Sequence, residues 1–138
     1  MKILALAVVV LLLVAVVVAV YIRFAPVKSA DVSLLPSNAP GDYALPGGFY
    51  AVRPLEAVDP VALEAQIAAT VRTKKVSGSA RDLPMIFIHR SLVWGFPDVT
   101  HVWVDADNLH VHSHLVFGKS DLGVNRERMQ SWFASLGL

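Results

Sequence analysis

The chain has 138 residues, 55% of them hydrophobic, and no cysteine. Most of the apolar excess lies in residues 1–22, where Lys2 is the one residue that is not apolar. Residues 23–138 carry 11 Lys and Arg (12 in the chain less Lys2) and 11 Asp and Glu, so their formal net charge is zero. This balance argues against a nucleic-acid partner, and the lack of cysteine excludes disulfides, thiolate zinc sites and a cysteine nucleophile.

Residues 3–22 form an uncharged apolar run whose length as a helix, about 30 Å, matches the hydrocarbon core of a bilayer. The alternative is a cleaved signal peptide, which has a shorter apolar region and a small-residue cleavage site. The nearest candidate site, Lys28-Ser29-Ala30, places a lysine at the outer small position. We therefore predict a transmembrane signal anchor over residues 1–22, with the lipid bilayer as its partner through residues 3–22. We expect a single pass through the cytoplasmic (inner) membrane, with the C-terminal domain extracytoplasmic.

The segment after the anchor is rich in proline and glycine, which interrupt both helix and strand patterns. It predicts a tether over residues 23–48, followed by a folded domain over residues 49–138. Within that domain, residues 49–52 are a short strand candidate. Asp59-Pro60 is a typical helix start, and the apolar spacing predicts a helix that continues to about Arg72 or Thr73. Lys74 and Lys75 would then lie at its C-terminal end, where cations are favourable.

Three further strands are predicted over residues 85–94, 99–104 and 109–117, separated by turn signals. If the turn at residues 105–108 closes tightly, Val104 faces Leu109 and His101 faces His112. Thr100 and Ser113 then lie on the core face with the apolar residues of both strands. A last helix is predicted over residues 122–136, ended by Gly137. The order of these elements indicates an α+β fold, a small antiparallel sheet with helices packed on one face, preceded by one transmembrane helix.

Histidines on the second face of this sheet are the first candidate site. Side chains at alternate strand positions point the same way, and the predicted pairing adds a fourth imidazole and an indole. The set is His101, Trp103, His110, His112 and His114. It predicts a binding surface, and the alternatives are an exposed polar sheet face, a face that charges below about pH 6.5, and a zinc site in which three of the four histidines hold the metal and one position stays open for water.

The start of the last helix is the second candidate site, because helix N-termini attract anions. Its residues are Lys119, Asp121, Asn125 and Arg126. The alternative is structural: Asp121 caps the helix, Asn125 bonds to a loop and Arg126 pairs with an acid.

Two stretches of the C-terminal half resemble the bacterial and plastid family called domain of unknown function 1499. Leu92-Val93-Trp94-Gly95-Phe96-Pro97-Asp98 resembles the family's "lfGFpDD" turn. Ser120-Asp121-Leu122-Gly123-Val124-Asn125-Arg126 matches the end of its "RSaSRvGySDLGvNRkR" motif completely. Two arginines of that motif correspond to His112 and Val116 here, and the family's cysteine-containing segment corresponds to residues 35–40 without cysteine. The resemblance covers about 90 residues from near Phe49 onward and implies a small α+β domain, often membrane-anchored or exported, with no established activity.

These observations together predict an anchored, non-enzymatic binding or interaction module for an envelope component, a lipid or a protein partner. No cofactor is predicted. The alternative function is a metal-dependent hydrolase that uses the histidine-rich sheet face, with zinc as its metal.

Overall fold

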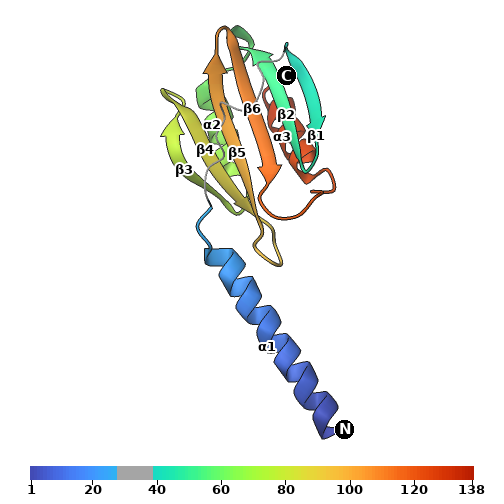
Figure 1. The fold of residues 1–138 in the computed structure, drawn as a ribbon. Coiled ribbons are helices and arrows are strands. Elements are labelled where there is room, and N and C mark those ends of the chain that lie inside the picture. Colours follow the sequence, from blue (N-terminus) through green and yellow to red (C-terminus); the bar gives the residue numbers. More distant parts are fainter. Residues whose placement is uncertain (28–38) are drawn as a thin grey trace.

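The structure is a computed structural model that describes residues 1–27 and 39–138. It begins with a single long helix, α1 (Lys2–Phe24), which stands apart from the rest of the molecule (Figure 1). An 18-residue window of α1 has a mean hydropathy of 3.6 and is not buried by the rest of the chain. Its 23 residues would span about 34 Å. The helix is therefore long and apolar enough to cross a membrane, by length and composition.

The other elements form one antiparallel sheet and two main helices, which confirms the predicted α+β class. The strands follow one another in the sheet in the order β1-β2-β6-β5-β4-β3. Their bounds are β1 (Gly41–Leu45), β2 (Gly48–Pro54), β3 (Thr73–Ser79), β4 (Asp82–Arg90), β5 (Pro97–Asp105) and β6 (Asn108–Leu115). A short 3-10 turn, η2 (Leu55–Ala57), leads into α2 (Pro60–Ala69), and α3 (Val124–Ser135) ends the domain.

The predicted register at the centre of the sheet is confirmed. Val104 pairs with Leu109 and His101 pairs with His112 across β5 and β6. Because strand side chains alternate between faces, this pairing places Val102 and Val111 on one face and the histidines on the other. The same register determines which face of the sheet each further residue of β5 and β6 lies on.

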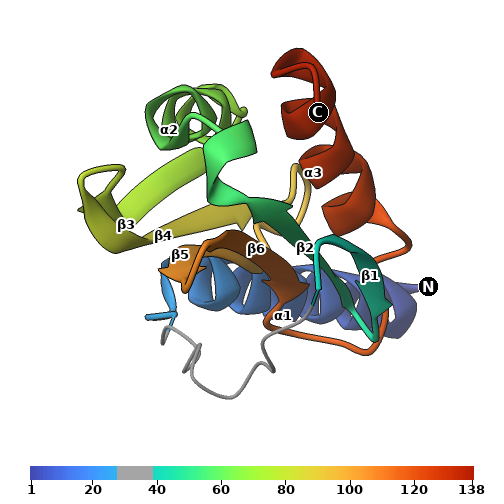
Figure 2. The same cartoon turned by 90° about the horizontal axis from the view of Figure 1, so that it is seen from above.

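Helices α2 and α3 lie next to each other on one face of the sheet (Figure 2). Asp59 caps α2, because its carboxylate accepts a 2.9 Å hydrogen bond from the Val61 N–H. Helix α3 ends at Ser135, and Gly137 just beyond it has a φ of +76° and donates its N–H to the carbonyl of Ala134 at 3.1 Å. The buried core between helices and sheet contains Phe49, Leu63, Ile67, Met85, Phe87, Val102, Leu109, Val111, Met129, Trp132 and Phe133.

Several predicted boundaries differ from those of the structure. Residues 41–45 form β1, so the expected tether over 23–48 ends too late; its residues 28–38 lie outside the described part of the chain. Helix α2 ends at Ala69 rather than near Arg72, and Lys74 and Lys75 belong to β3, which was not predicted. Strand β4 ends at Arg90 and β6 at Leu115, so residues 91–94 and 116–117 are loop. The edge strands β1 and β3 are partly exposed. Strand β1 is five residues long and lies among prolines and glycines, and β3 has a mostly exposed run without alternation.

Candidate functional site

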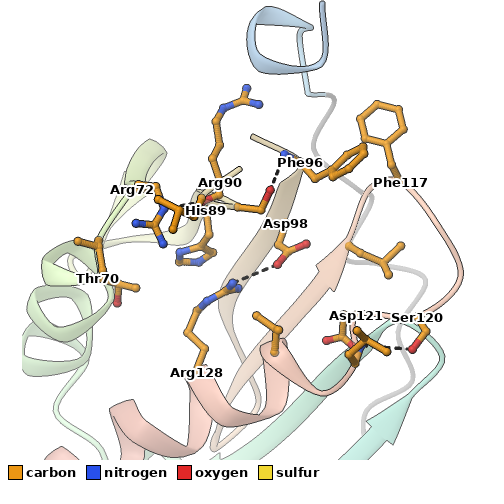
Figure 3. A pocket seen from close by; sticks show the side chains of 16 residues that line it. Thr70, Arg72, His89, Arg90, Phe96, Asp98, Phe117, Ser120, Asp121 and Arg128 are labelled. Carbon is orange, nitrogen blue, oxygen red and sulfur yellow. Dashed lines mark hydrogen bonds and ion pairs between the residues drawn. The ribbon is translucent and has the colours of Figure 1, made fainter. Parts of the chain in front are cut away.

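The end of the sheet nearest α1 contains a cavity of about 590 Å³ (Figure 3). Its wall comes from the α2–β3 connection, the β4–β5 and β6–α3 loops and the first turns of α3. We call it the signature cavity, because both family-like stretches of the sequence contribute to it. It is lined by Thr70, Val71, Arg72, His89, Arg90, Ser91, Leu92, Phe96, Asp98, Leu115, Phe117, Ser120, Asp121, Leu122, Val124 and Arg128. This volume is typical of a small-molecule site.

One side chain ties this cavity to α1. Arg90 Nη1 donates hydrogen bonds to the carbonyl oxygens of Ile22, at 3.1 Å, and Gly95, at 2.9 Å. Ile22 lies in the last turn of α1, whose carbonyls have no partner within the helix. The β4–β5 loop is thus held against the end of α1, as Figure 1 also shows.

A row of buried polar side chains crosses the core face of the sheet beside the cavity. Thr73 Oγ1 lies 2.7 Å from His89 Nδ1, and His89 Nε2 lies 2.8 Å from Thr100 Oγ1. Thr100 Oγ1 lies 2.8 Å from Ser113 Oγ, which donates a 2.6 Å bond to Asn125 Oδ1. His89, Thr100, Ser113 and Asn125 are all buried. With a proton on His89 Nε2, every group in the row donates to the next, from Thr73 to Asn125.

Arg128 joins this row to the cavity wall. Its guanidinium donates to Asn125 Oδ1 at 2.8 Å and to Asp98 Oδ2 at 3.1 Å (Figure 3). Burial, together with the positive charge of Arg128, lowers the pKa of His89 to about 3. Burial raises the pKa of Asp98, and the hydrogen-bonded Arg128 opposes that shift. His89 is therefore neutral at physiological pH, and the one cation in the row is paired with an acid.

The start of α3 forms another part of the wall. The Asp121 carboxylate accepts hydrogen bonds from the N–H groups of Asn125, at 2.9 Å, and Gly123, at 3.2 Å. Burial alone would raise the pKa of Asp121, but these bonds lower it. Leu122 beside it has a φ of +54° and is 90% exposed. An apolar, non-glycine residue held in that conformation in the open is a feature that core packing does not explain.

The predicted histidine surface consists of His101, Trp103, His110, His112 and His114. These residues share one face of the sheet, but they are more buried than the residues of an exposed polar face. His101 and His110 are fully buried, whereas Trp103, His112 and His114 are partly exposed. The rings stack: His112 and His114 lie 4.8 Å apart, Trp103 and His110 5.0 Å, and His101 and His114 5.9 Å between centroids. Tyr50 from β2 shares a 2.6 Å hydrogen bond with His110 Nδ1. A partner that binds this surface would meet Trp103, His112 and His114 only.

Burial also changes the chemistry of these imidazoles. It lowers the pKa of His101 to about 4 and that of His112 to about 3, with neighbouring histidines adding to both shifts. Burial lowers the pKa of His110 as well, against the effect of Asp105. These pKa shifts do not favour a common charging of the imidazoles just below pH 6.5. In the described part of the chain, no group of three His, Asp or Glu side chains is placed to hold a metal ion.

Two roles were considered for the residues at the start of α3, anion binding and a structural role, and the structure assigns some of the residues to the structural role. Asp121 caps the helix start, and Asn125 belongs to the buried row rather than to a loop contact. Arg126 is exposed, and its guanidinium lies 5.5 Å from the Phe49 ring centroid. It forms no ion pair with an acid among the described residues, and Lys119 is exposed. Sequence reasoning missed His89, Arg90, Asp98 and Arg128. One signal could have found them: the predicted core face of the sheet carries two hydroxyls, Thr100 and Ser113, which need polar partners once they are buried.

The fold and the signature cavity define a small α+β domain with a concave site at the end nearest an apolar N-terminal helix. A family model described as a protein of unknown function (DUF1499) matches residues 31–136. The chain belongs to this family, as its sequence motifs indicated. No curated protein matches the chain, and no solved structure matches it.

Proposed function

We propose that this protein is a membrane-anchored binding module of the cell envelope and that the signature cavity holds a lipid-like, amphiphilic component of that envelope. The observation that carries the proposal is the hydrogen bond from Arg90 to Ile22, because it joins the cavity wall to the end of α1, the one helix among the described residues that is long and apolar enough to span a bilayer. A ligand that leaves the bilayer surface there would reach the cavity directly.

The lining of the cavity favours an amphiphile. Apolar side chains come from both loops, and Phe96 and Phe117 lie at the rim with ring centroids 6.3 Å apart. Polar groups converge from the opposite wall, where Arg72, Asp98 and Arg128 lie. An apolar wall with a few placed polar groups is typical of a site that orients one ligand.

The protonation pattern supports binding rather than catalysis. Both ring nitrogens of His89 are engaged with threonine hydroxyls, and Ser113 donates to Asn125 rather than to a base. Nucleophilic catalysis needs a hydroxyl paired with a free base. The described cavity residues supply no such pair, and the metal-dependent hydrolase has no three-ligand group to support it.

The test is native mass spectrometry of the full-length protein extracted in mild detergent from its own membranes. We expect a retained amphiphile in the parent and its loss in Val71→Trp, which would fill the cavity mouth. Val61→Trp is the matched control, because Val61 is also exposed but lies at the opposite end of α2. Equal retention by both variants, or a protein that carries no ligand, would contradict the proposal.

A further inference from the structure

A second cavity, of about 530 Å³, lies beside the C-terminal end of α1 and shares Arg72 and Arg90 with the first. Five cationic side chains line it: Arg23, Arg72, Lys74, Lys75 and Arg90. No acidic residue lines it in the part of the chain that the structure describes. We call it the basic cavity.

The charges of the basic cavity are largely uncompensated. Lys75 Nζ forms an ion pair with Glu64 Oε1 at 2.6 Å. The other four cations take part in no ion pair among the described residues. Arg72 uses Nε and Arg90 uses Nη1 to bond backbone carbonyls, which leaves further N–H groups of both guanidinium forks to donate. Like charges gathered around a hollow repel one another, so an anion in the hollow would relieve the repulsion.

The position of the basic cavity identifies the anion. Arg23 is in the last turn of α1, and Arg90 bonds to Ile22 in that same turn. If α1 spans the bilayer, this turn lies at the level of the lipid headgroups, where basic clusters attract anionic lipids. The β4–β5 loop beside it exposes Leu92, Val93 and Trp94, which are 70%, 71% and 45% exposed. Apolar side chains next to a cationic hollow are complementary to a phospholipid, with its acyl chains and its phosphate.

We propose that the basic cavity binds the phosphate headgroup of an anionic membrane phospholipid and so fixes the domain on the bilayer surface. The inference rests on the proposed anchoring by α1. It concerns a different hollow and a different role from the signature cavity: this lipid is part of the membrane that supports the domain.

The experiment reconstitutes the full-length protein into nanodiscs made of equal parts phosphatidylglycerol and phosphatidylcholine. The complex is then released in mild detergent, and native mass spectrometry measures the ratio of the two retained lipids. We expect enrichment of phosphatidylglycerol in the parent. Lys74→Gln should lower the enrichment about fivefold, since each surface cation near a membrane contributes about that factor. Arg72→Gln/Lys74→Gln should lower it further.

The control is Arg81→Gln, which removes one charge from an exposed position that does not line the basic cavity. It should leave the enrichment unchanged, and near-ultraviolet circular dichroism should show that all variants fold. No enrichment in the parent, or an equal loss in Lys74→Gln and Arg81→Gln, would overturn the site. Delipidated protein is also titrated with inorganic phosphate, and phosphate binding without phosphatidylglycerol enrichment would assign the site to a free anion and overturn the lipid. A chain that does not enter nanodiscs would instead contradict the anchoring itself.

Discussion

The hydroxyl of Ser113 on β6 donates a 2.6 Å hydrogen bond to Asn125 Oδ1 on α3, and both residues are fully buried. The same oxygen accepts a bond from Arg128. This one amide therefore connects the polar row of the sheet to the wall of the signature cavity. Ser113 is fully buried, so no solvent can take the place of the Asn125 amide for it, whereas Arg128 is partly exposed.

Replacing Asn125 by leucine should destabilise the domain by about 1–3 kcal/mol, because the buried Ser113 hydroxyl and a partly buried Arg128 N–H lose their acceptor. The measurement is urea unfolding of the full-length protein in detergent, followed by near-ultraviolet circular dichroism. Gln130→Leu, at an exposed position of the same helix, should change the free energy of unfolding by less than about 0.5 kcal/mol. Equal losses for the two variants would show that the buried row contributes nothing to stability.

The buried histidines should make the domain sensitive to acid. The pKa is about 3 for His89, about 4 for His101 and about 3 for His112 in the folded protein, against about 6.5 in the unfolded chain. Below pH 6.5 the unfolded chain binds protons that the folded chain does not, so stability falls as the pH drops from about 6.5 to about 4 and is level above that range. Asp98, whose pKa burial raises, opposes part of this loss.

The slope of stability against pH in that range should reach about 1.4 kcal/mol per pH unit for each histidine. His101→Phe keeps an aromatic ring in the stack and removes one titrating group, so its slope should be smaller by that amount. Urea midpoints measured between pH 7 and pH 4 test this. A free energy of unfolding that does not change with pH would mean that these imidazoles are accessible to protons in the folded state.

Gly78 in β3 is expected to tolerate no side chain. Its φ is +72°, and a Cβ atom there would lie 2.0 Å from the carbonyl oxygen of Pro84. Gly118 also has a positive φ, +104°, but a Cβ there would meet nothing within 4 Å. Gly118→Ala should cost about 1 kcal/mol for its backbone conformation, and Gly78→Ala about 3 kcal/mol or more because backbone must move as well. Comparable thermal midpoints for the two variants would contradict the difference.

The β4–β5 loop should lie in the lipid interface, if α1 is inserted. Because the chain has no cysteine, a single spin label can be placed without other changes. A nitroxide at Val93→Cys in nanodiscs should be more accessible to oxygen than to a water-soluble nickel reagent, since oxygen concentrates in lipid. Val61→Cys, at the other end of the domain, should show the opposite preference. If the label at residue 93 were as accessible to the nickel reagent as the label at residue 61, the loop would lie in water.

The elements that could be predicted from the sequence are those marked by a local residue pattern or a turn signal. Leu109 to His112 of β6 alternate apolar residues with histidines, and the tight turn to β5 determined the pairing of His101 with His112. Strands β1 and β3 are at the two edges of the sheet. Strand β1 is five residues long and lies among prolines and glycines, and β3 is mostly exposed with irregular register at Lys75–Ser79, so neither has an apolar run that marks a strand. Helix α2 was predicted too long because the apolar spacing continues to Val71, which is 73% exposed.

The sequence by itself determined the apolar helix, the α+β class, the central register and the family, since each of these depends on local pattern or on a contiguous motif. Only the tertiary structure decided which polar residues meet. Arg90 reaches Ile22 across 68 positions of sequence, and Trp132 Nε1 reaches Thr70 Oγ1 across 62. It also decided the pKa values of the histidines, because the burial that lowers them depends on which residues cover each imidazole. Contacts between distant segments arise from packing, and no local spacing records them.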